Sequence, residues 1–501
     1  MQHIFVLGDQ LNLQVGPLSR ADPAQTVVLM VESVAHGAAR PYHKQKLALV
    51  YSAMRHFKLA LEAGGFTVSY QACQTWDDGI AAHLETYPNA TIALMQPADF
   101  GVAAQLDQLV TAHGGRLELV ENELWLSKDA DWQGFARGKK QLRMEFFYRQ
   151  MRQQTGWLMD AGEPIGGQFN FDADNRQPPP RDHVFPPKLE FLPDELTLQT
   201  MAWVSERFPD HFGTLETFNW PVTREDALGA LEHFLAHRFE NFGPYEDAML
   251  SGEAQLYHSL LSPAINLGLL TAREVCEAAL ERADRVPLSS LEGFLRQILG
   301  WREFMRHVYN AKMPALRSSN GLEHFAALPE LYWTAQTEMN CMHHAVTQLQ
   351  ETGHTHHIQR LMVLGNFALL LGVEPQQLNE WFLFGYVDAY DWVVTPNVIG
   401  MSQFADLGSF TSKPYIAGGA YIDRMSDYCK GCKYNPKQSS GSSACPFTTL
   451  YWDFIDRHTG RFAGHPRMGM AVNAWKKRDE TDKTAILERA SEIKAQLKPR
   501  D

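Results

Sequence analysis

The run Ile4–Gln10 (IFVLGDQ) opens the chain with four apolar residues that end in a polar turn. Four more apolar runs follow before residue 126, at Val27–Val31, Thr67–Gln71, Thr91–Met95 and Leu117–Val120. Stretches with helical spacing of apolar residues separate the runs, most clearly His43–Ala63. This alternation predicts an α/β domain over residues 1–126, built as a doubly wound parallel sheet with helices on both faces.

The polar residues after these runs predict a ligand crevice. The carboxyl ends of parallel strands gather at one edge of the sheet, where Gly8-Asp9-Gln10 and Glu32 would lie. No GxGxxG or Walker-type loop follows any of the runs. We therefore expect a ligand other than a nucleotide held by the usual phosphate cradle.

Length and charge narrow the class of protein. The 501 residues allow two to four domains, and 45 % hydrophobic with 21 % charged residues excludes wholesale disorder and fibrous repeats. The net charge of −13 argues against a protein that coats nucleic acid or anionic membrane by bulk charge. A negative net charge is still compatible with one locally basic groove on the surface.

Residues 127–216 are predicted to connect two domains. Within them, Arg137–Arg152 carries six basic residues and one acid with aromatic residues interleaved. A solvated amphipathic helix is the more common structure of such a stretch, and a face for nucleic acid or domain docking is the alternative. Gln177–Leu192 is proline-rich and predicts an extended linker.

From about residue 217 onward helical periodicity replaces the strand pattern, which predicts a large all-α domain over residues 217–501. The expected helices include Phe218–Phe239, Leu288–Tyr309, Leu331–Glu351 and His356–Leu371. The longest apolar stretch, Leu361–Val373, contains Asn366 and is too short to span a bilayer. The N-terminus has no basic region and so does not resemble a signal peptide. We expect a cytoplasmic protein with no membrane partner.

Four of the six cysteines predict a metal centre. Cys429 and Cys432 form a CxxC pair, Cys445 follows a short Ser/Gly-rich loop, and Cys341 lies upstream on a predicted helix. Four thiolates suit either tetrahedral zinc or a [4Fe–4S] cluster, and their spacing leaves both open. The alternative hypothesis, that these cysteines are buried and bind no metal, is less favoured, because a CxxC pair with a third cysteine nearby seldom arises by chance.

Two further segments are rich in chemically active side chains. Five histidines fall within fifteen residues, at 343, 344, 354, 356 and 357. Metal binding, proton transfer, and surface histidines without a chemical role all remain open for them. Tyr415–Tyr428 holds the Gly418-Gly419 pair between tyrosines, and either a structural turn or close approach to a ligand explains it.

Combined, several motifs resemble the photolyase/cryptochrome family. They are HSLLSPAINLG at 258–268, FLRQILGWR at 294–302, HHIQRLMVLGN at 356–366 and VDAYDWVVTPNVIGMSQ at 387–403. The four cysteines and the run MSDYCKGC narrow the resemblance to the iron–sulfur bacterial branch of that family. LGDQL near the N-terminus and FNFDADNRQPP in the connecting region extend the resemblance over essentially the whole chain.

This resemblance implies cofactors and their sites. FAD would be held in the helical domain, and [4Fe–4S] rather than zinc would be bound by Cys341, Cys429, Cys432 and Cys445. The antenna 6,7-dimethyl-8-ribityllumazine would lie in the N-terminal domain at Asp9, Gln10 and Glu32. The implied FAD contacts are Tyr245, His258, Ser259, Leu261, Ser262, Gln297, Trp301, Arg302, His357, Asp388, Asp391 and Asn397.

The resemblance also implies an activity, namely light-driven electron transfer from reduced FAD to a pyrimidine–pyrimidone (6-4) lesion flipped out of UV-damaged DNA. His356 and His357 would supply the proton, with His357 preferred. Tyr415 and Tyr421 would border the lesion pocket. Trp381 and Trp333 would carry electrons to oxidised flavin, although Phe382 beside Trp381 cannot act as a tyrosyl step.

Two basic groups are candidates for DNA contact: the segment Arg137–Arg152, and the favoured set Lys413, Lys430, Lys433 and Lys437. We expect a monomer. Two alternatives are a light-signalling cryptochrome on the same scaffold and an iron–sulfur nucleic-acid enzyme unrelated to light. The second would leave the flavin motifs unexplained.

Overall fold

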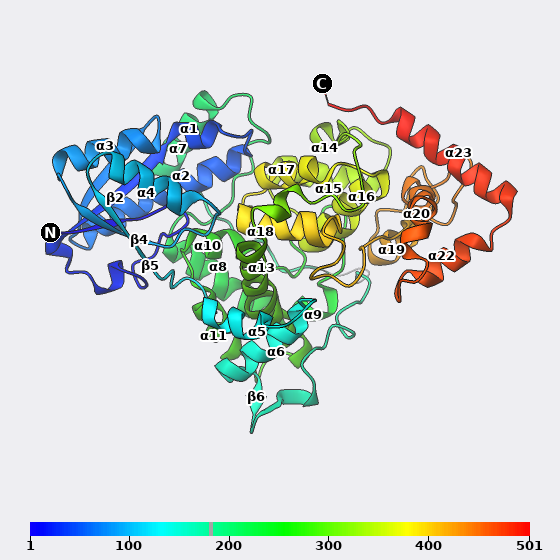
Figure 1. Cartoon of the computed structure of the whole chain (residues 1–501), viewed down its shortest axis with the longest axis horizontal. Helices are drawn as coiled ribbons and strands as arrows, with labels where there is room; N and C mark the ends of the chain where they lie inside the picture. Colours follow the sequence, from blue (N-terminus) through cyan, green and yellow to red (C-terminus); the bar gives the residue numbers. More distant parts are fainter. Residues whose placement is uncertain (180–183, 501) are drawn as a thin grey trace.

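The computed structural model describes residues 1–179 and 184–500, which form an N-terminal α/β part and a larger helical part (Figure 1). A parallel sheet of order β3-β2-β1-β4-β5 organises the first part. Its strands are β1 (Gln2–Phe5), β2 (Thr26–Ser33), β3 (Thr67–Cys73), β4 (Thr91–Met95) and β5 (Arg116–Val120). The predicted fold class of a parallel-sheet domain followed by a helical domain is confirmed.

Helices cover both faces of the sheet. They are α1 (Val34–Ala38), α2 (Lys44–Ala63), α3 (Trp76–Thr86) and α4 (Val102–Ala112), with 3-10 turns η1 (Leu18–Arg20) and η2 (Pro23–Gln25). The helix expected at 43–63 begins one residue later because His43 caps it: its Nδ1 accepts from the backbone N–H of Gln45. Every predicted strand is present, with ends shifted by no more than two residues.

The connecting region holds more regular structure than a linker. It contains α5 (Asp129–Ala136), α6 (Met144–Thr155), a short hairpin of β6 (Met159–Asp160) and β7 (Glu163–Pro164), η3 (Ile165–Gly167) and α7 (Glu195–Arg207). The basic segment Arg137–Arg152 becomes helical only from Met144. Helix α7 packs on α2 and so extends the α/β part. The described residues of Gln177–Leu192 form no helix or strand, as predicted, and residues 180–183 lie outside the description.

The helical part begins at Arg224. Its first helices are α8 (Arg224–His237), α9 (Phe239–Tyr245), α10 (Ser262–Leu267), α11 (Ala272–Leu280), α12 (Leu288–Leu295), α13 (Glu303–Lys312), α14 (Leu331–Thr334), α15 (Asn340–Thr352) and α16 (Asn366–Leu371). They are followed by α17 (Pro375–Gly385), α18 (Asp391–Thr395), α19 (Gly419–Met425), α20 (Pro446–Arg457), α21 (Thr459–Phe462), α22 (Gly469–Lys476) and α23 (Glu480–Gln496). The 3-10 turn η5 (Ala315–Ser318) follows α13.

Three π-helical segments occur in the helical part, and the first two interrupt the helices that the sequence predicted over Leu288–Tyr309 and His356–Leu371. They are η4 (Arg296–Arg302), η6 (Gln359–Gly365) and η7 (Pro396–Ser402). The helix expected over Leu331–Glu351 is also broken, because Ala335 adopts a left-handed backbone with φ of 56° between α14 and α15. A π-helical turn displaces the following side chains around the helix axis, and such turns are frequent at functional sites.

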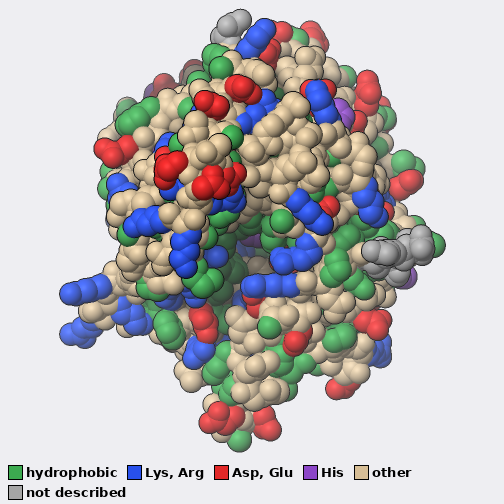
Figure 2. Space-filling view, turned by 90° about the vertical axis from the view of Figure 1, so that its right-hand side faces the viewer, with side chains coloured by type: hydrophobic (Ala, Val, Ile, Leu, Met, Phe, Trp, Pro, Cys, Tyr) green, Lys and Arg blue, Asp and Glu red, His purple; other side chains and the backbone are tan. Residues whose placement is uncertain are grey.

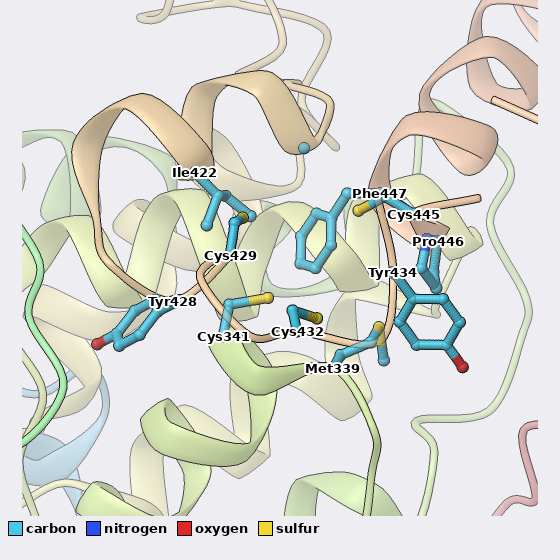
Figure 3. A pocket seen from close by; sticks show the side chains of 11 residues that line it. Met339, Cys341, Ile422, Tyr428, Cys429, Cys432, Tyr434, Cys445, Pro446 and Phe447 are labelled. Atoms are coloured by element: carbon cyan, nitrogen blue, oxygen red, sulfur yellow. The ribbon is translucent and has the colours of Figure 1, made fainter. Parts of the chain in front are cut away.

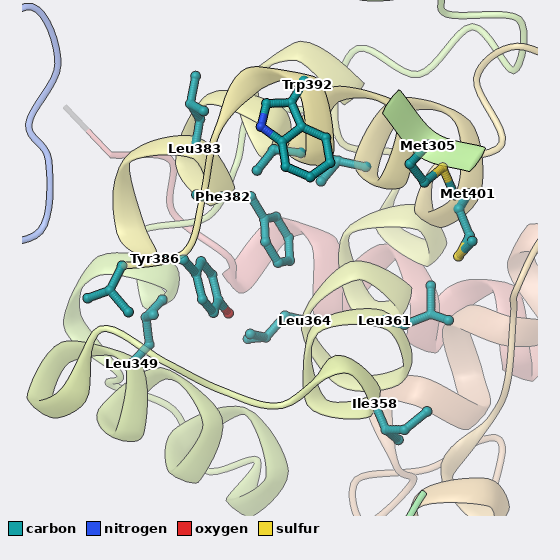
Figure 4. Close-up of a cluster of buried hydrophobic side chains, with 14 of the residues drawn as sticks. Met305, Leu349, Ile358, Leu361, Leu364, Phe382, Leu383, Tyr386, Trp392 and Met401 are labelled. Carbon is teal, nitrogen blue, oxygen red and sulfur yellow. The ribbon is translucent and has the colours of Figure 1, made fainter. Parts of the chain in front are cut away.

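A hydrophobic core packs the helical part around α17 and the three π segments. Figure 4 shows Phe382 and Tyr386 of this core facing Leu364, with Trp392 above them. The same core continues to the sheet, where buried Lys46 donates to the carbonyls of Leu383 and Ala389 at 3.1 and 2.5 Å. Lys46 is part of α2, so these bonds hold the last turn of α17 and the loop before α18 against α2. No helix among residues 1–179 and 184–500 is both long and apolar enough to cross a membrane.

Candidate flavin site and cysteine centre

The residues expected to contact FAD lie largely on the π segments and on one strained loop. Gln297, Trp301 and Arg302 are on η4, and Asn397 is on η7. His258–Ser262 forms the loop into α10, in which Leu260 has a left-handed backbone with φ of 55°. Strained backbone of this kind is typical of ligand clamps.

A buried ion pair joins this loop to η6. Arg360 of η6 donates to Asp388 through two nitrogens, each 3.0 Å from a carboxylate oxygen, and Ser262 Oγ donates to the same carboxylate at 2.7 Å. Although burial opposes ionisation, Arg360 holds the pKa of Asp388 down at about 2. The Arg360 guanidinium also lies 4.1 Å from the centre of the Tyr386 ring. The pair ties the segments that carry the expected flavin contacts.

Two stacked imidazoles lie beside this pair. The rings of His258 and His356 are 4.5 Å apart and nearly parallel. Both ring nitrogens of His356 and Nε2 of His258 are buried without a hydrogen-bond partner among the described residues. Burial lowers the pKa of His258 to about 4 and that of His356 further. Buried polar atoms of this kind require a partner, so a bound ligand is indicated here.

His357 completes what we call the histidine site: His258, His356, His357, Arg360 and Asp388. The His357 side chain is accessible to solvent, but it is also surrounded by protein atoms. This surrounding protein, by desolvation, and then the charge of Arg360 lower the pKa of His357 to about 4. This combination is typical of a side chain that lines a recess inside the protein. Tyr245, Gln297 and Asn397 are also partly exposed. The side-chain amide of Asn397 donates a hydrogen bond to the Val393 carbonyl.

Two other expected FAD contacts are engaged elsewhere. Asp391 accepts from Tyr309, Arg317 and Thr395. Arg302 lies 3.9 Å from the Trp125 ring centre and 5.2 Å from that of Trp392, and it donates to Glu303. Through these contacts Arg302 packs against both Trp125, which follows the sheet in the chain, and Trp392 of the helical part.

The expected electron-relay tryptophans differ in their surroundings. Trp381 is fully buried and donates to the Tyr332 carbonyl, with its ring 5.0 Å from the Tyr332 ring and 5.2 Å from Phe382. Trp333 is partly exposed and lies beside the guanidinium of Arg500. The structure thus gives one buried and one accessible indole, linked through the backbone of Tyr332 and Trp333.

The four predicted cysteine ligands line one small cavity. Cys341 comes from α15, Cys429 and Cys432 from the loop after α19, and Cys445 caps α20 (Figure 3). Burial raises the pKa of Cys341, Cys429 and Cys445. Within the described part of the chain, no three His, Cys, Asp or Glu side chains converge closely enough to hold a single metal ion.

A basic cluster surrounds Tyr415, and it combines several distant segments. The charges of Arg143, Arg176 and Arg467 act on the Tyr415 hydroxyl, and Lys413 lies near Arg176 and Arg467. Arg467 also donates to Ser412 Oγ at 3.0 Å. We call Arg143, Arg176, Lys413 and Arg467 the basic cluster. Figure 2 shows Lys and Arg side chains gathered around a hollow on one face of the molecule.

The remaining predicted residues are more dispersed. Tyr421 is near Asp247, Arg424 and Arg176. Lys433 pairs with Glu338 at 2.6 Å, whereas Lys430 and Lys437 are exposed in the cysteine loop. Of the favoured basic set, the structure therefore brings only Lys413 next to Tyr415.

The three expected antenna residues differ in availability: Asp9 and Gln10 follow β1, and Glu32 is the last residue but one of β2. Glu32 accepts from Arg55 and from Tyr70, so its carboxylate is already bound. Gln10 donates to the Met95 carbonyl, and its side-chain oxygen is buried without a partner among the described residues. Burial raises the pKa of Asp9 to about 6.

Sequence reasoning missed Arg360, Arg176 and Arg467. Arg360 stands inside the motif at 356–366, four residues after His356, so helical spacing could have placed it beside the histidines. Arg176 and Arg467 come from stretches with no basic run, and no local pattern marks them.

Comparison with known proteins establishes the family. Residues 4–220 match the family described as "Deoxyribodipyrimidine photo-lyase-related protein". A "(6-4) photolyase" of Agrobacterium fabrum is 42 % identical over 96 % of this chain and 96 % of its own length.

Two solved structures share the fold. A bacterial class III photolyase from Agrobacterium tumefaciens aligns with a TM-score of 0.59 at 16 % identity, covering 99 % of this chain and 97 % of that one. A cryptochrome of Synechocystis sp. PCC6803 aligns with a TM-score of 0.63 at 14 % identity, covering 99 % of each chain. By its full-length likeness to the A. fabrum protein, the chain belongs to the photolyase/cryptochrome family.

Proposed function

We propose that this chain is a light-driven DNA repair enzyme that reverses pyrimidine–pyrimidone (6-4) photoproducts. The observation that carries the proposal is the 42 % identity, over nearly the full length of both chains, to a protein named (6-4) photolyase. The geometry supports it through the histidine site and the basic cluster beside Tyr415. Repair acts on genomic DNA, so we place the enzyme in the bacterial cytoplasm. We also propose that it acts as a monomer.

Membership of the family implies FAD, and the histidine site fits it. The unpartnered nitrogens of His258 and His356 need hydrogen bonds from a ligand. Tyr245, Ser262, Gln297 and Asn397 would complete the lining. Bound and reduced, FAD supplies an electron on excitation by light. The Arg360 guanidinium, paired with Asp388, would stabilise an anionic ring system beside it.

His357 is proposed as the proton donor at the lesion. Burial and the Arg360 cation lower its pKa to about 4 in the ligand-free chain, so its imidazole is neutral at pH 7. An anion bound nearby favours the protonated form and raises that pKa. Binding of an anionic cofactor and of DNA would therefore bring His357 toward the range in which a general acid works.

The cysteine cavity is proposed to hold a [4Fe–4S] cluster. Four thiols line it, and a [4Fe–4S] cluster takes one thiolate on each of its four irons. The cluster would tie α15 to the loop after α19 and to the start of α20. We propose a structural role for it, because this loop directly follows the segment of Tyr415 and Tyr421.

The antenna 6,7-dimethyl-8-ribityllumazine is proposed to bind at the carboxyl edge of the sheet. The supporting observation is the free side-chain oxygen of Gln10, which can accept from a ring N–H. The paired Glu32 would then contribute only through its remaining lone pairs.

The test uses protein purified without oxygen and illuminated with an oligonucleotide that contains one (6-4) lesion. The proposal requires flavin absorption and light-dependent loss of the lesion. Replacing both His356 and His357 by Asn should abolish repair and leave photoreduction of bound flavin intact. Flavin photoreduction with no repair by the unmodified chain would instead indicate a light-signalling cryptochrome.

A further inference from the structure

A large cavity lies behind the strained loop, outside the histidine site. Its volume is about 560 Å³, in the range of small-molecule sites. It lies between the connecting region, α8, the loop 250–260 and α15. Of the residues expected to contact FAD, only Ser259 lines it. The cavity is therefore separate from the recess at His357 and Arg360.

Aromatic side chains form much of its wall. Phe191 comes from the connecting region, Trp220 from the segment just before α8, Phe234 from α8, and Tyr428 from the segment that precedes Cys429. Trp220 is held in place because its indole N–H donates to the Gln45 side chain at 2.9 Å. Tyr428 is already stacked on His344, with ring centres 5.4 Å apart, so Phe191 and Trp220 are left as the aromatic walls for a ligand. Fixed aromatic walls favour a flat ring.

The polar groups of the wall point to a ring with both donors and acceptors. His233, His344 and His354 line the cavity, and no hydrogen bond joins their ring nitrogens to the rest of the described chain. His354 is only 8 % exposed. Burial lowers the pKa of all three, that of His354 to about 3. Each neutral imidazole therefore offers one N–H donor and one acceptor nitrogen.

Charges are sparse and lie at the exposed edge, where Lys188 and Glu351 are opposite in sign. The amides of the wall, Gln255 and Gln348, already donate to backbone carbonyls. A ligand with a strongly charged core would find no buried counter-charge here. We propose that this cavity is a binding site for an uncharged bicyclic nitrogen heterocycle, a purine or a pteridine, distinct from the flavin and antenna sites.

The test titrates the FAD-loaded protein separately with adenosine, guanosine and biopterin, following Trp fluorescence and heat. At least one purine or one pteridine should bind with one site per chain and without release of FAD. Whether a purine or a pteridine binds identifies the chemical class of the ligand. No binding of any probe at millimolar concentration, or binding that displaces FAD, would overturn the proposal.

Two tryptophan variants of α8 locate the site. Ala230 lines the cavity, so Ala230→Trp fills it and should weaken binding about tenfold or more. Ala236 is exposed on the same helix and does not line the cavity, so Ala236→Trp should leave affinity within about twofold. His354→Phe keeps the ring shape and removes the nitrogens, and it should weaken binding while retaining FAD. Equal affinity in all variants would show that the probe binds elsewhere.

Discussion

Arg360 and Asp388 face each other through two nitrogen–oxygen distances of 3.0 Å, although they are 28 residues apart in the chain. Asp388 is 9 % exposed, and Ser262 and Arg360 both donate to its carboxylate. This arrangement joins η6, the loop before α18 and the start of α10. The site is therefore held by a charge pair that no local stretch of sequence contains.

Asp388→Asn removes the charge that Arg360 requires. Breaking a buried pair leaves an uncompensated charge, so we expect the free energy of unfolding to fall by about 3–5 kcal/mol and bound flavin to be largely lost. Urea unfolding and flavin absorbance measure the two effects. Glu480→Gln, in an exposed pair with Lys483, is the matched control and should change neither. Full flavin content in Asp388→Asn would contradict this role.

Replacement of Cys445 by Ser should remove the iron. Anaerobically purified protein is expected to carry four irons and four sulfides per chain, and Cys445→Ser should lose most of both together with the absorption near 400 nm. Cys276→Ser is the control, because Cys276 is buried in α11 away from the cavity. One zinc per chain with no sulfide would refute the cluster.

Buried histidines make stability depend on pH. Burial lowers the pKa of fully buried His83 to about 4, against 6.5 in the unfolded chain. Between these values the unfolded state binds more protons, so acidification destabilises the fold, by about 3 kcal/mol from His83 at pH 4. His83→Phe should flatten the fall in unfolding free energy between pH 6.5 and 4.5, measured by urea unfolding.

The control for that experiment is His237→Asn, because His237 is exposed on α8. It should leave the slope of unfolding free energy against pH unchanged. If His83→Phe and His237→Asn gave the same slope as the unmodified chain, the buried imidazole would not be the source of the pH dependence.

Trp381 is expected to carry electrons to oxidised flavin. Trp381→Phe keeps the packing against Tyr332 and Phe382 but removes the oxidisable indole. Photoreduction of bound flavin in the presence of a thiol should slow about tenfold or more, since each 1.4 kcal/mol of barrier is a factor of about ten. Trp132→Phe, in α5, is the control. Unchanged photoreduction in Trp381→Phe would place the relay elsewhere.

Much of the fold follows from local pattern, and the site does so only in part. β4 was predicted to the residue because a parallel strand buried on both faces is a continuous apolar run with turns at its ends. The four cysteines were predicted to gather, since their chemistry requires it. The π turn at Arg296–Arg302 was not predicted, because this segment makes tertiary contacts with α6 that periodicity does not record.

The basic cluster shows the same limit. Arg143, Arg176, Lys413 and Arg467 come from four separate segments and meet only in the folded chain. Sequence patterns predicted Arg143, within Arg137–Arg152, and Lys413, but they missed Arg176 and Arg467. They favoured the cysteine-loop lysines, of which Lys433 pairs with Glu338. A cluster assembled by folding leaves no pattern that sequence periodicity could detect.

Arg467→Gln and Lys413→Gln should weaken binding to lesion-containing DNA without changing FAD content. Each phosphate contact that is lost should reduce the slope of log affinity against log salt by about 0.9, because fewer counterions are released. Affinity measured by fluorescence anisotropy at several salt concentrations gives this slope. Lys58→Gln, on α2 and away from Tyr415, is the control and should keep it. Lys437→Gln changes a lysine of the cysteine loop. If it lowered the slope while Arg467→Gln did not, DNA would bind along the cysteine loop rather than across the basic cluster.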